Sequence, residues 1–384
     1  MTGINHKNMS KNNKHLLLKE IMTRKTVTRG DLCKKTSLSK MTITALVNEF
    51  IEKGIIRECG VASKNNGRRP TLLEVVPNSL LTLAISIDRD MLEVGIINLK
   101  GQILCVESVP FNFIRGNDAF LSSLYMICDR IVKTSYFEKV WGVGISSAGP
   151  LSIADGIILE PPDFNNVKNL EIVSAISKRY GLPTYLQNDM CLAALSEVYF
   201  GDTGSFDNFI YVGIASGIGG GVIIDKQLYT GSNGLAGVIG HSIVEMDGLQ
   251  CECGQKGCLE KYSSTRATLK WAIQNGADKS LSWVELTKKA VDGDEICYEA
   301  IKRMTNYLEV AVTNMEIAYD TECFIIGGDL HFCRELITER IALNLNKRSK
   351  AWGFNKKVQV RPSTFVGNGS FVGTVALVME NNMN

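Results

Sequence analysis

The pattern of apolar and polar positions divides the chain into a helical start and a longer stretch of alternating strands and helices. Near the start, apolar side chains recur at spacings of three and four, which is the spacing of one buried helix face; the clearest run is Ile43, Leu46, Val47 and Phe50. Thr28 and Ser39 stand where helices would begin and are residue types that favour the N-cap. We therefore predict helices over 14–24, 29–35 and 40–52, after a disordered polar segment over 1–13.

The three predicted helices and the segment that follows them form a candidate DNA-binding head over residues 1–78. A tight turn precedes the third helix, as in a helix-turn-helix whose last helix enters the major groove. Two apolar segments, 54–60 and 71–76, can pair as a two-stranded wing. The residues expected to contact DNA lie on the exposed side of the third helix and at the tip of the wing: Lys40, Thr42, Thr44, Asn48, Arg68 and Arg69.

Residues 79–384 alternate strand and helix patterns, which is typical of an α/β body. We predict strands over 81–88, 92–98, 102–110, 141–146, 183–186, 209–214, 222–225 and 323–326. We predict helices over 118–133 and 190–201, several more within 264–320, and a last one from about residue 371.

The distribution of charge changes the picture of the head. The net charge is only +2, but residues 1–70 carry 15 Lys and Arg against 5 Asp and Glu, and the remaining residues carry 27 against 35. A basic head on an acidic body indicates a polyanionic partner for the head alone, so we predict double-stranded DNA there. The alternative is a protein-docking helical module with a solvated basic face.

The composition places the protein in the cytoplasm. No apolar run is long enough to cross a membrane, so we expect no membrane association. Eleven cysteines, an odd number that is mostly scattered along the chain, fit a reducing compartment better than a disulfide framework.

Three of those cysteines form the clearest chemical signature in the chain. Cys251, Cys253 and Cys258 lie within eight residues of one another, with glycines between them, and His241 precedes them by ten residues. Three thiolates and one imidazole suit Zn²⁺ in tetrahedral geometry, and a site with four protein ligands is structural. We predict a structural zinc knuckle with His241, Cys251, Cys253 and Cys258 as ligands; the alternative is three unrelated core cysteines.

The residues upstream of the knuckle connect it to a known family. A glycine-rich turn over 213–221 is followed by the Ala-Gly-x-Ile-Gly-His motif that ends at His241, then by the knuckle, then by Glu260. This series resembles the ROK family of repressors and sugar kinases, from about residue 15 to the C-terminus. The resemblance implies a two-lobed ribonuclease-H/actin-like body behind a winged helix-turn-helix. The implied domains are 1–78, a first lobe over 79–189 with the last helix 371–384, and a second lobe over 190–370.

The resemblance also implies a carbohydrate effector in the cleft between the lobes. Asn188 and Asp189 match the family's Asn-Asp pair, whose Asp is the general base in the kinases; a helix N-cap is the alternative role for Asp189. His241 can offer its second ring nitrogen to a sugar hydroxyl, and Glu260 matches a sugar-binding glutamate. Asp163 stands in a loop over the sugar where the family usually has Asn.

Two departures from the family pattern argue against catalysis. The kinases have Asp-x-Gly-Gly-Thr in the first hairpin, whereas this chain has Asp90, Met91 and Leu92 after Asp88-Arg89. An added carboxylate and lost backbone access both oppose a bound polyphosphate, so we predict no kinase activity. Val238 replaces a glutamate of the family's Glu-x-Gly-His motif and removes one sugar acceptor.

These features together predict a sugar-responsive transcriptional repressor that acts as a homodimer or homotetramer. Two alternatives remain open from the sequence: a sugar kinase with an added DNA-binding head, and a repressor controlled by a protein partner. The sequence does not identify the effector or the operator.

Overall fold

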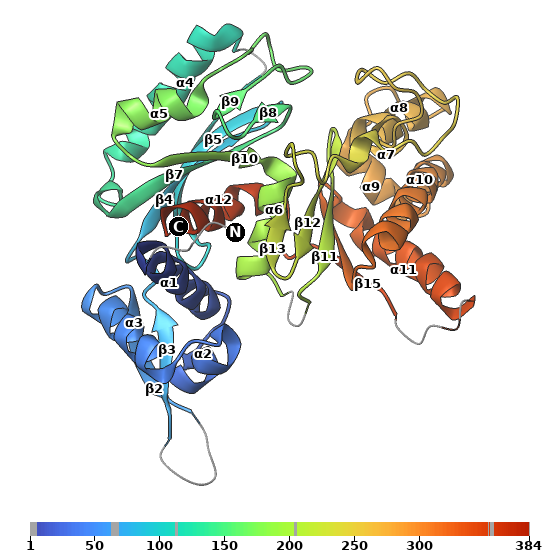
Figure 1. The fold of residues 1–384 in the computed structure, drawn as a ribbon. Helices are drawn as coiled ribbons and strands as arrows, with labels where there is room; N and C mark the ends of the chain where they lie inside the picture. The colour runs from blue at the N-terminus through green and yellow to red at the C-terminus, as the bar shows by residue number, and fades with distance from the viewer. Residues whose placement is uncertain are drawn as a thin grey trace. The chain divides into compact units, whose positions relative to one another are not determined.

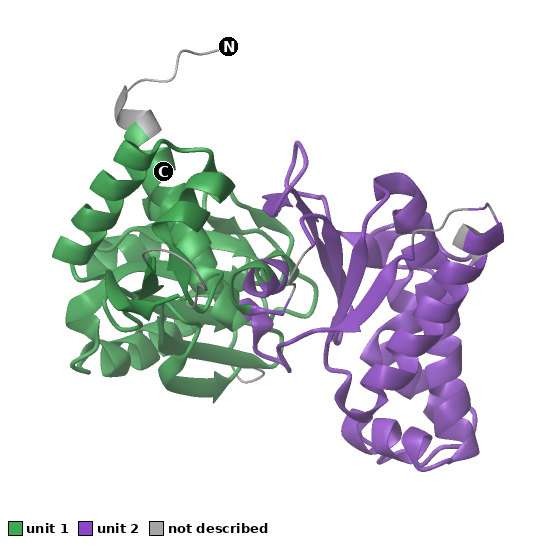
Figure 2. Cartoon of the chain, turned by 90° about the horizontal axis from the view of Figure 1, so that it is seen from below, with its two compact units in different colours: residues 1–192, 198–200, 371–384 green, residues 193–197, 201–370 purple. Residues whose placement is uncertain are grey.

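The computed structural model describes residues 6–62, 69–111, 114–202, 206–351, 353 and 357–383. The chain divides into two compact units: unit 1 comprises residues 1–192, 198–200 and 371–384, and unit 2 comprises residues 193–197 and 201–370 (Figure 2). The head belongs to unit 1. Among the described residues, none of the helices combines the length and apolar character needed to span a membrane.

The head contains three helices and a small sheet (Figure 1). The helices are α1 (His6–Met22), α2 (Arg29–Thr36) and α3 (Lys40–Glu52). The strands lie in the order β1 (Val27–Thr28), β3 (Thr71–Val75) and β2 (Ile56–Val61), with antiparallel pairing throughout. The three predicted helices and the predicted pairing of the two wing strands are therefore present.

The start of α1 differs from the prediction. The helix begins at His6, so the expectation of disorder through residue 13 is wrong from residue 6 onward. The segment lacks an apolar stripe in its sequence, but adding turns to a formed helix is easier than nucleating one. The buried stripe of Leu17, Leu18 and Ile21 supplies that formed helix.

The N-caps of α2 and α3 form as the residue types predict. The Thr28 hydroxyl accepts a hydrogen bond from the backbone N–H of Asp31, whose carboxylate accepts one in return from the Thr28 N–H, which completes a capping box. Ser39 Oγ accepts from the N–H of Thr42 at 3.1 Å. Each cap satisfies a backbone donor that the first turn would leave without a partner.

The body contains two five-stranded sheets with the same plan. The sheet of unit 1 has the order β10 (Thr184–Asn188), β7 (Val140–Ser147), β4 (Leu81–Ile87), β5 (Met91–Asn98) and β6 (Ile103–Pro110). The sheet of unit 2 has the order β15 (Gln359–Pro362), β14 (Cys323–Gly328), β11 (Phe209–Ile214), β12 (Ile218–Ile224) and β13 (Gln227–Tyr229). In each sheet the first three strands along the chain pair antiparallel and the last two join in parallel. This repeat confirms the predicted two-lobed α/β body and adds the edge strands β13 and β15, which the sequence pattern missed.

Helices cover both sheets. The helices of unit 1 are α4 (Gly116–Val132), α5 (Ile172–Tyr180) and the last helix, α12 (Gly369–Asn382), while α6 (Asp189–Phe200) contributes residues to both units. The helices of unit 2 are α7 (Glu260–Ser263), α8 (Thr265–Gln274), α9 (Trp283–Val291), α10 (Glu295–Tyr319) and α11 (Arg334–Ala351). Short elements complete the chain: η1 (Phe137–Lys139), β8 (Leu151–Ser152), β9 (Ile157–Ile158), η2 (Ile239–His241) and η3 (His331–Cys333).

Glycines in β7 allow α12 to approach the sheet of unit 1 closely. A Cβ atom added at Gly144 would lie 2.7 Å from Thr374 Cβ, and one at Gly142 would lie 2.7 Å from Val378 Cγ1. Real side chains do not tolerate such distances, so any larger residue at these positions would push the helix off the sheet.

The end of α12 also contacts the head within unit 1. Lys19 Nζ of α1 lies 3.2 Å from Glu380 Oε1 of α12, and the Tyr199 hydroxyl donates to the same oxygen at 3.1 Å. Lys19 also lies over the Tyr199 ring, 5.1 Å from its centroid. His15 lies beside this group, and burial lowers the pKa of its imidazole. An ionic contact that is largely removed from water therefore joins the head to the body.

We expect Lys19→Met to lower the free energy of unfolding by about 1 to 3 kcal/mol, because it leaves Glu380 without its cation. The matched control is Arg130→Met, which removes an ion pair to Glu107. The side chain of Lys19 is only 12% exposed, whereas that of Arg130 is 56% exposed, so the control should change stability by less than about 0.5 kcal/mol. Urea unfolding of the full chain measures both, and equal effects would contradict the contact's role.

Candidate functional site

The predicted metal ligands converge in unit 2. One ligand atom from each of His241, Cys251, Cys253 and Cys258 lies within 4.8 Å of all the others. The Cys253 and Cys258 sulfurs are 3.5 Å apart, and His241 Nδ1 is 3.6 Å from the Cys251 sulfur. A tetrahedral site with metal–sulfur bonds of about 2.3 Å has sulfur–sulfur edges of about 3.8 Å, so the four atoms fit a single metal ion.

The ionisation of the thiols also favours a cation. Burial and the neighbouring sulfurs raise the pKa of Cys258 to about 12, so this residue is a neutral thiol when no positive charge is near. A bound dication would hold it as a thiolate instead. The donor set is soft and nitrogen–sulfur in character, which suits transition metals and excludes magnesium or calcium.

Glycine makes the tight turn of the knuckle possible. Gly257 has φ of +75°, a left-handed conformation, and a Cβ at this position would collide with the Glu245 carbonyl oxygen. Its N–H donates to the Leu249 carbonyl and its carbonyl accepts from the Val244 N–H. This pairing folds the segment before the cysteines onto the segment between them.

Aromatic and charged side chains from α7 and α10 contact the segment that leads into the knuckle. The Tyr262 hydroxyl accepts from the Leu249 N–H at 2.6 Å, and the Tyr262 ring stacks on Tyr307 with centroids 4.4 Å apart. The Arg303 guanidinium lies over both rings, and the Tyr307 hydroxyl donates to Glu245. These contacts could not be predicted from the sequence, because the residues that make them are far apart in the chain and carry no motif.

Glu260 connects the knuckle to the glycine-rich turn. Its Oε2 accepts a hydrogen bond from the Ile218 N–H at 3.0 Å, at the start of β12. One carboxylate oxygen of Glu260 therefore fixes the backbone at the start of β12. Among the described residues, no hydrogen bond is found to the other carboxylate oxygen of Glu260.

The structure gives the glycine-rich segment a packing role. Gly220 lies within β12, and a Cβ there would lie 2.6 Å from the Tyr211 carbonyl oxygen and 3.0 Å from Ile239. At Gly237 and Gly240 a Cβ would collide with the carbonyl oxygens of Gly220 and Ile218, respectively. These glycines let the segment before His241 lie directly on β12. Val238, which replaces a family glutamate, is 46% exposed in that segment.

The predicted Asn-Asp pair lies in unit 1, where β10 leads into α6. Asn188 is the last residue of β10 and Asp189 is the first of α6. Asn188 Oδ1 accepts from the N–H groups of Met190 and Cys191 at 3.1 and 3.4 Å. The cap role that the sequence offered for Asp189 is therefore largely taken by Asn188, although Asp189 Oδ1 also accepts from the Met190 N–H at 2.8 Å.

Asp189 is held in a position that disfavours its charge. Burial, together with the nearby charge of Asp88, raises the pKa of Asp189 to about 6. The same causes raise the pKa of Glu93. Three carboxylates thus gather at one end of the sheet of unit 1. Raised carboxylate pKa values are common at sites that bind or transform polar ligands.

The turn between β4 and β5 contains the residues predicted to stand in place of the kinase phosphate loop. The Asp88 N–H donates to the Met91 carbonyl at 3.0 Å, and Asp88 Oδ1 accepts from the Arg89 N–H at 2.6 Å. Asp90 is exposed in the middle of this turn. The turn therefore presents carboxylates. It is also held by distant residues, since the Phe111 N–H donates to the Asp90 carbonyl at 2.8 Å and Arg89 Nε donates to the Pro162 carbonyl at 3.4 Å.

Asp163 lies in a loop of unusual backbone conformation. It has φ of +59°, and Asn165, Asn166 and Asn169 also have positive φ. Aspartate and asparagine are the side chains that tolerate this region best, so the residue types suit the loop. Asp163 is exposed.

The predicted DNA contacts in the head differ in exposure. Lys40, Thr44, Asn48 and Arg69 are exposed. Thr42 is half-buried, and its hydroxyl lies 2.9 Å from Ser39 Oγ. Arg68 lies outside the described residues.

Several basic residues of the head are neutralised within the molecule. Lys14 and Lys53 pair with Glu49, Arg29 with Glu58, and Arg57 with Glu74. Across the described ranges no carboxylate lies within ion-pair distance of Lys34, Lys35 or Lys40, which flank the turn between α2 and α3. These charges are available to an external anion.

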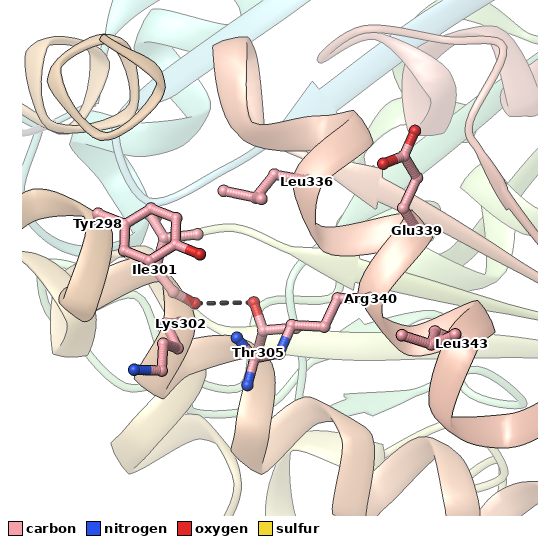
Figure 3. Close-up of a pocket in the computed structure, with 8 residues that line it drawn as sticks. All are labelled: Tyr298, Ile301, Lys302, Thr305, Leu336, Glu339, Arg340 and Leu343. Atoms are coloured by element: carbon pink, nitrogen blue, oxygen red, sulfur yellow. Dashed lines mark hydrogen bonds between the residues drawn. The ribbon is translucent and has the colours of Figure 1, made fainter. Parts of the chain in front are cut away.

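A groove in unit 2 lies between α10 and α11 (Figure 3). Its volume is about 290 Å³, and it is lined by Tyr298, Ile301, Lys302, Thr305, Leu336, Glu339, Arg340 and Leu343. None of the predicted effector residues lines it, so it is distinct from the predicted sugar contacts.

The duplicated α/β fold and the Cys-His cluster define a class of two-lobed proteins, and comparison with known sequences identifies the family. Residues 82–381 match the profile of the ROK family, so the chain belongs to the ROK family. The xylose repressor of Caldicellulosiruptor bescii is 29% identical to it, over 98% of this chain and 97% of the repressor.

Two solved structures extend the comparison. A ROK family transcriptional regulator, described as a homologue of the E. coli Mlc protein, superimposes with a TM-score of 0.81 at 25% identity, over 97% of this chain and 96% of that one. A ROK glucokinase from Streptomyces griseus, in complex with glucose and AMPPNP, reaches a TM-score of 0.67 at 25% identity and covers 77% of this chain and 98% of its own. The regulator matches nearly the full chain, whereas the kinase leaves almost a quarter unmatched.

We expect Cys253→Ala to remove bound metal, because a missing direct ligand should cost more than the roughly 10- to 100-fold in affinity that a missing outer partner costs. Elemental analysis of the purified chain should give about one divalent metal ion per wild-type chain and far less in the variant, together with a lower melting temperature. Cys59→Ala, which removes another exposed cysteine, should retain the metal. Full metal content in Cys253→Ala would disprove the four-ligand assignment.

We expect Asp189→Asn to stabilise the protein at neutral pH. The raised pKa means that the folded state binds a proton between about pH 4 and 6 that the unfolded state has lost, so wild-type stability falls as pH rises through this window. The variant should exceed the wild type by about 2 to 3 kcal/mol at pH 8 and match it near pH 4. Chemical unfolding at both pH values measures the difference, with Asp292→Asn as an exposed control. A gain that is the same at both pH values would show that it does not come from titration of Asp189.

Proposed function

We propose that this protein is a sugar-responsive transcriptional repressor, in which the head binds operator DNA and the ROK body binds a carbohydrate. One observation carries the proposal: the chain joins a basic three-helix head to a ROK body, and repressors of the family resemble it along nearly their whole length. The proposal extends to the winged helix-turn-helix, the zinc ion and the effector contacts described below.

The head acts as a winged helix-turn-helix, with α3 as the recognition helix and the β2–β3 hairpin as the wing. The unpaired charges of Lys34, Lys35 and Lys40 lie at the turn and the start of α3, where a helix-turn-helix meets the phosphate backbone. Arg69 supplies a further cation near the tip of the wing, just before β3 begins. Affinity should fall steeply with salt, because these residues release counterions from the phosphates.

The body recognises the effector through hydroxyl acceptors and donors. Asn188 and Asp189 in unit 1 and His241 and Glu260 in unit 2 supply these contacts, with Asp163 as a further acceptor. His241 Nδ1 faces the Cys251 sulfur, so a metal there leaves Nε2 for a hydroxyl. Zinc fits the cluster best, and its task is to hold the segment that carries His241 and Glu260 in one conformation.

The second candidate function is sugar phosphorylation. It is favoured by the Asn188-Asp189 pair and by the likeness to the glucokinase. It is opposed by the turn over 88–92, where Asp88 and Asp90 present carboxylates and Met91 occupies a family glycine position. An ATP polyphosphate would meet like charge there.

Control of DNA binding requires two arrangements that the effector distinguishes. A homodimer would place two heads on an inverted-repeat operator, with half-sites about one or two helical turns apart. An effector that binds one arrangement better shifts the spacing of the heads and so releases the DNA. A protein regulator of the same equilibrium is the remaining alternative.

Thermal unfolding of the full chain against monosaccharides, sugar phosphates and ATP tests the proposal. A true effector at one hundred times its dissociation constant should add about 2.7 kcal/mol, and ATP should add nothing. Asp189→Asn should lose most of the response to the sugar, whereas Asp292→Asn should keep it.

A shift with ATP, followed by transfer of phosphate to a sugar, would replace the repressor proposal with the kinase. No shift with any of these compounds would favour the protein regulator.

A further inference from the structure

The exposed face of α3 is mostly uncharged, which contacts with phosphate alone would not require. At about 100° per residue, Met41, Thr44, Ala45 and Asn48 fall within an arc of about 100° on the helix. All four are exposed, and Met41 is 85% exposed. The opposite face, with Ile43, Leu46, Val47 and Phe50, is buried in the head.

Three of the four residues on this face present methyl groups. Met41 and Ala45 end in methyls. The Thr44 hydroxyl donates to the Lys40 carbonyl at 2.8 Å, one turn back along the helix, so its polar group is already used and its methyl remains. Met41 also stands in the first turn of α3, and it is the N-terminal part of a recognition helix that reaches the base edges.

The fourth residue of the face, Asn48, has an exposed amide, and no hydrogen bond to it is found within the described residues. An asparagine amide can pair with the N6 and N7 atoms of adenine in the major groove. The face contains no arginine or lysine, which are the usual readers of guanine. Lys40 lies on the flank, about 100° from Met41, where it suits a phosphate.

We propose that α3 reads A·T base pairs: Met41, Thr44 and Ala45 contact thymine methyl groups, and Asn48 binds adenine. This inference rests on the proposed function as a DNA-binding repressor and names the bases that the head recognises. Thymine is the only base with a methyl group in the major groove, so a surface of methyls beside one amide complements a run of A·T pairs.

The first experiment selects duplexes from a randomised library with the full-length wild-type protein. The enriched half-site should contain consecutive A·T pairs. Half-sites dominated by G·C pairs would overturn the base assignment while leaving the repressor proposal intact. If no sequence is enriched, the proposed function itself fails, and this inference fails with it.

The second experiment removes single atoms or groups from the selected duplex. Replacing thymine by uracil at one position at a time deletes the methyl and keeps the pairing. At one or more positions this substitution should weaken wild-type binding about fourfold, because that factor corresponds to the free energy of burying one methyl or methylene group. Met41→Ala should bind the thymine duplex about 5- to 20-fold more weakly and lose sensitivity to uracil at its position.

Met246→Ala is the matched control, since Met246 is 84% exposed in unit 2; it should bind like the wild type and keep the uracil effect. If uracil is tolerated everywhere by the wild type, the methyl contacts do not exist.

Asn48 has its own probe. Replacing adenine by 7-deazaadenine removes the N7 acceptor, and at one position this should weaken wild-type binding about tenfold while leaving Asn48→Ala unchanged. Equal losses in both proteins would show that another residue reads the adenine. Because Met41 and Asn48 are exposed, unchanged melting temperatures should accompany both variants.

Discussion

The close packing of α12 against the glycines of β7 is the contact on which unit 1 depends. The last helix of the chain can cover a sheet built from residues 81–188 only because Gly142 and Gly144 leave room for Val378 and Thr374. The same helix places Glu380 beside Lys19, and Asn382 donates to the Trp141 carbonyl while it accepts from the Tyr185 hydroxyl. The last helix therefore joins the sheet to the head.

Two groups of the proposed sites lie where their charged forms are disfavoured. Burial raises the pKa of Asp189 and of the Cys258 thiol, so each would hold a negative charge at a cost. Both costs are relieved by binding: a metal stabilises the thiolate, and hydroxyl donors stabilise the carboxylate. Binding sites commonly lower the free energy of unfolding, because a group whose hydrogen bonds and charge are fully satisfied within the protein cannot bind a ligand.

Local signals in the chain predicted more of the fold than of the site. The caps Thr28 and Ser39 located two helices of the head, and runs of apolar residues located the main strands, because both are set by near neighbours. The predicted start of α1 was wrong, because a helix that extends into a polar segment leaves no apolar pattern in the sequence there. The edge strands β13 and β15 were missed, because three or four residues at a sheet edge carry little signal. At the site, the pattern located Asn188 and Asp189 and gave capping as an alternative role for Asp189. Both side chains accept hydrogen bonds from N–H groups in the first turn of α6, a division that depends on side-chain geometry.

Residue types at fixed spacing were enough to predict the four residues that converge in the knuckle, the basic character of the head and the resemblance to the ROK family. The packing of distant segments was needed to show that Glu260 holds the Ile218 backbone, that glycines of β12 serve packing, and that Asp88 lies close enough to raise the pKa of Asp189. Those outcomes depend on distances between segments far apart in the chain. They follow from how the sheets, helices and loops pack, which no local pattern encodes.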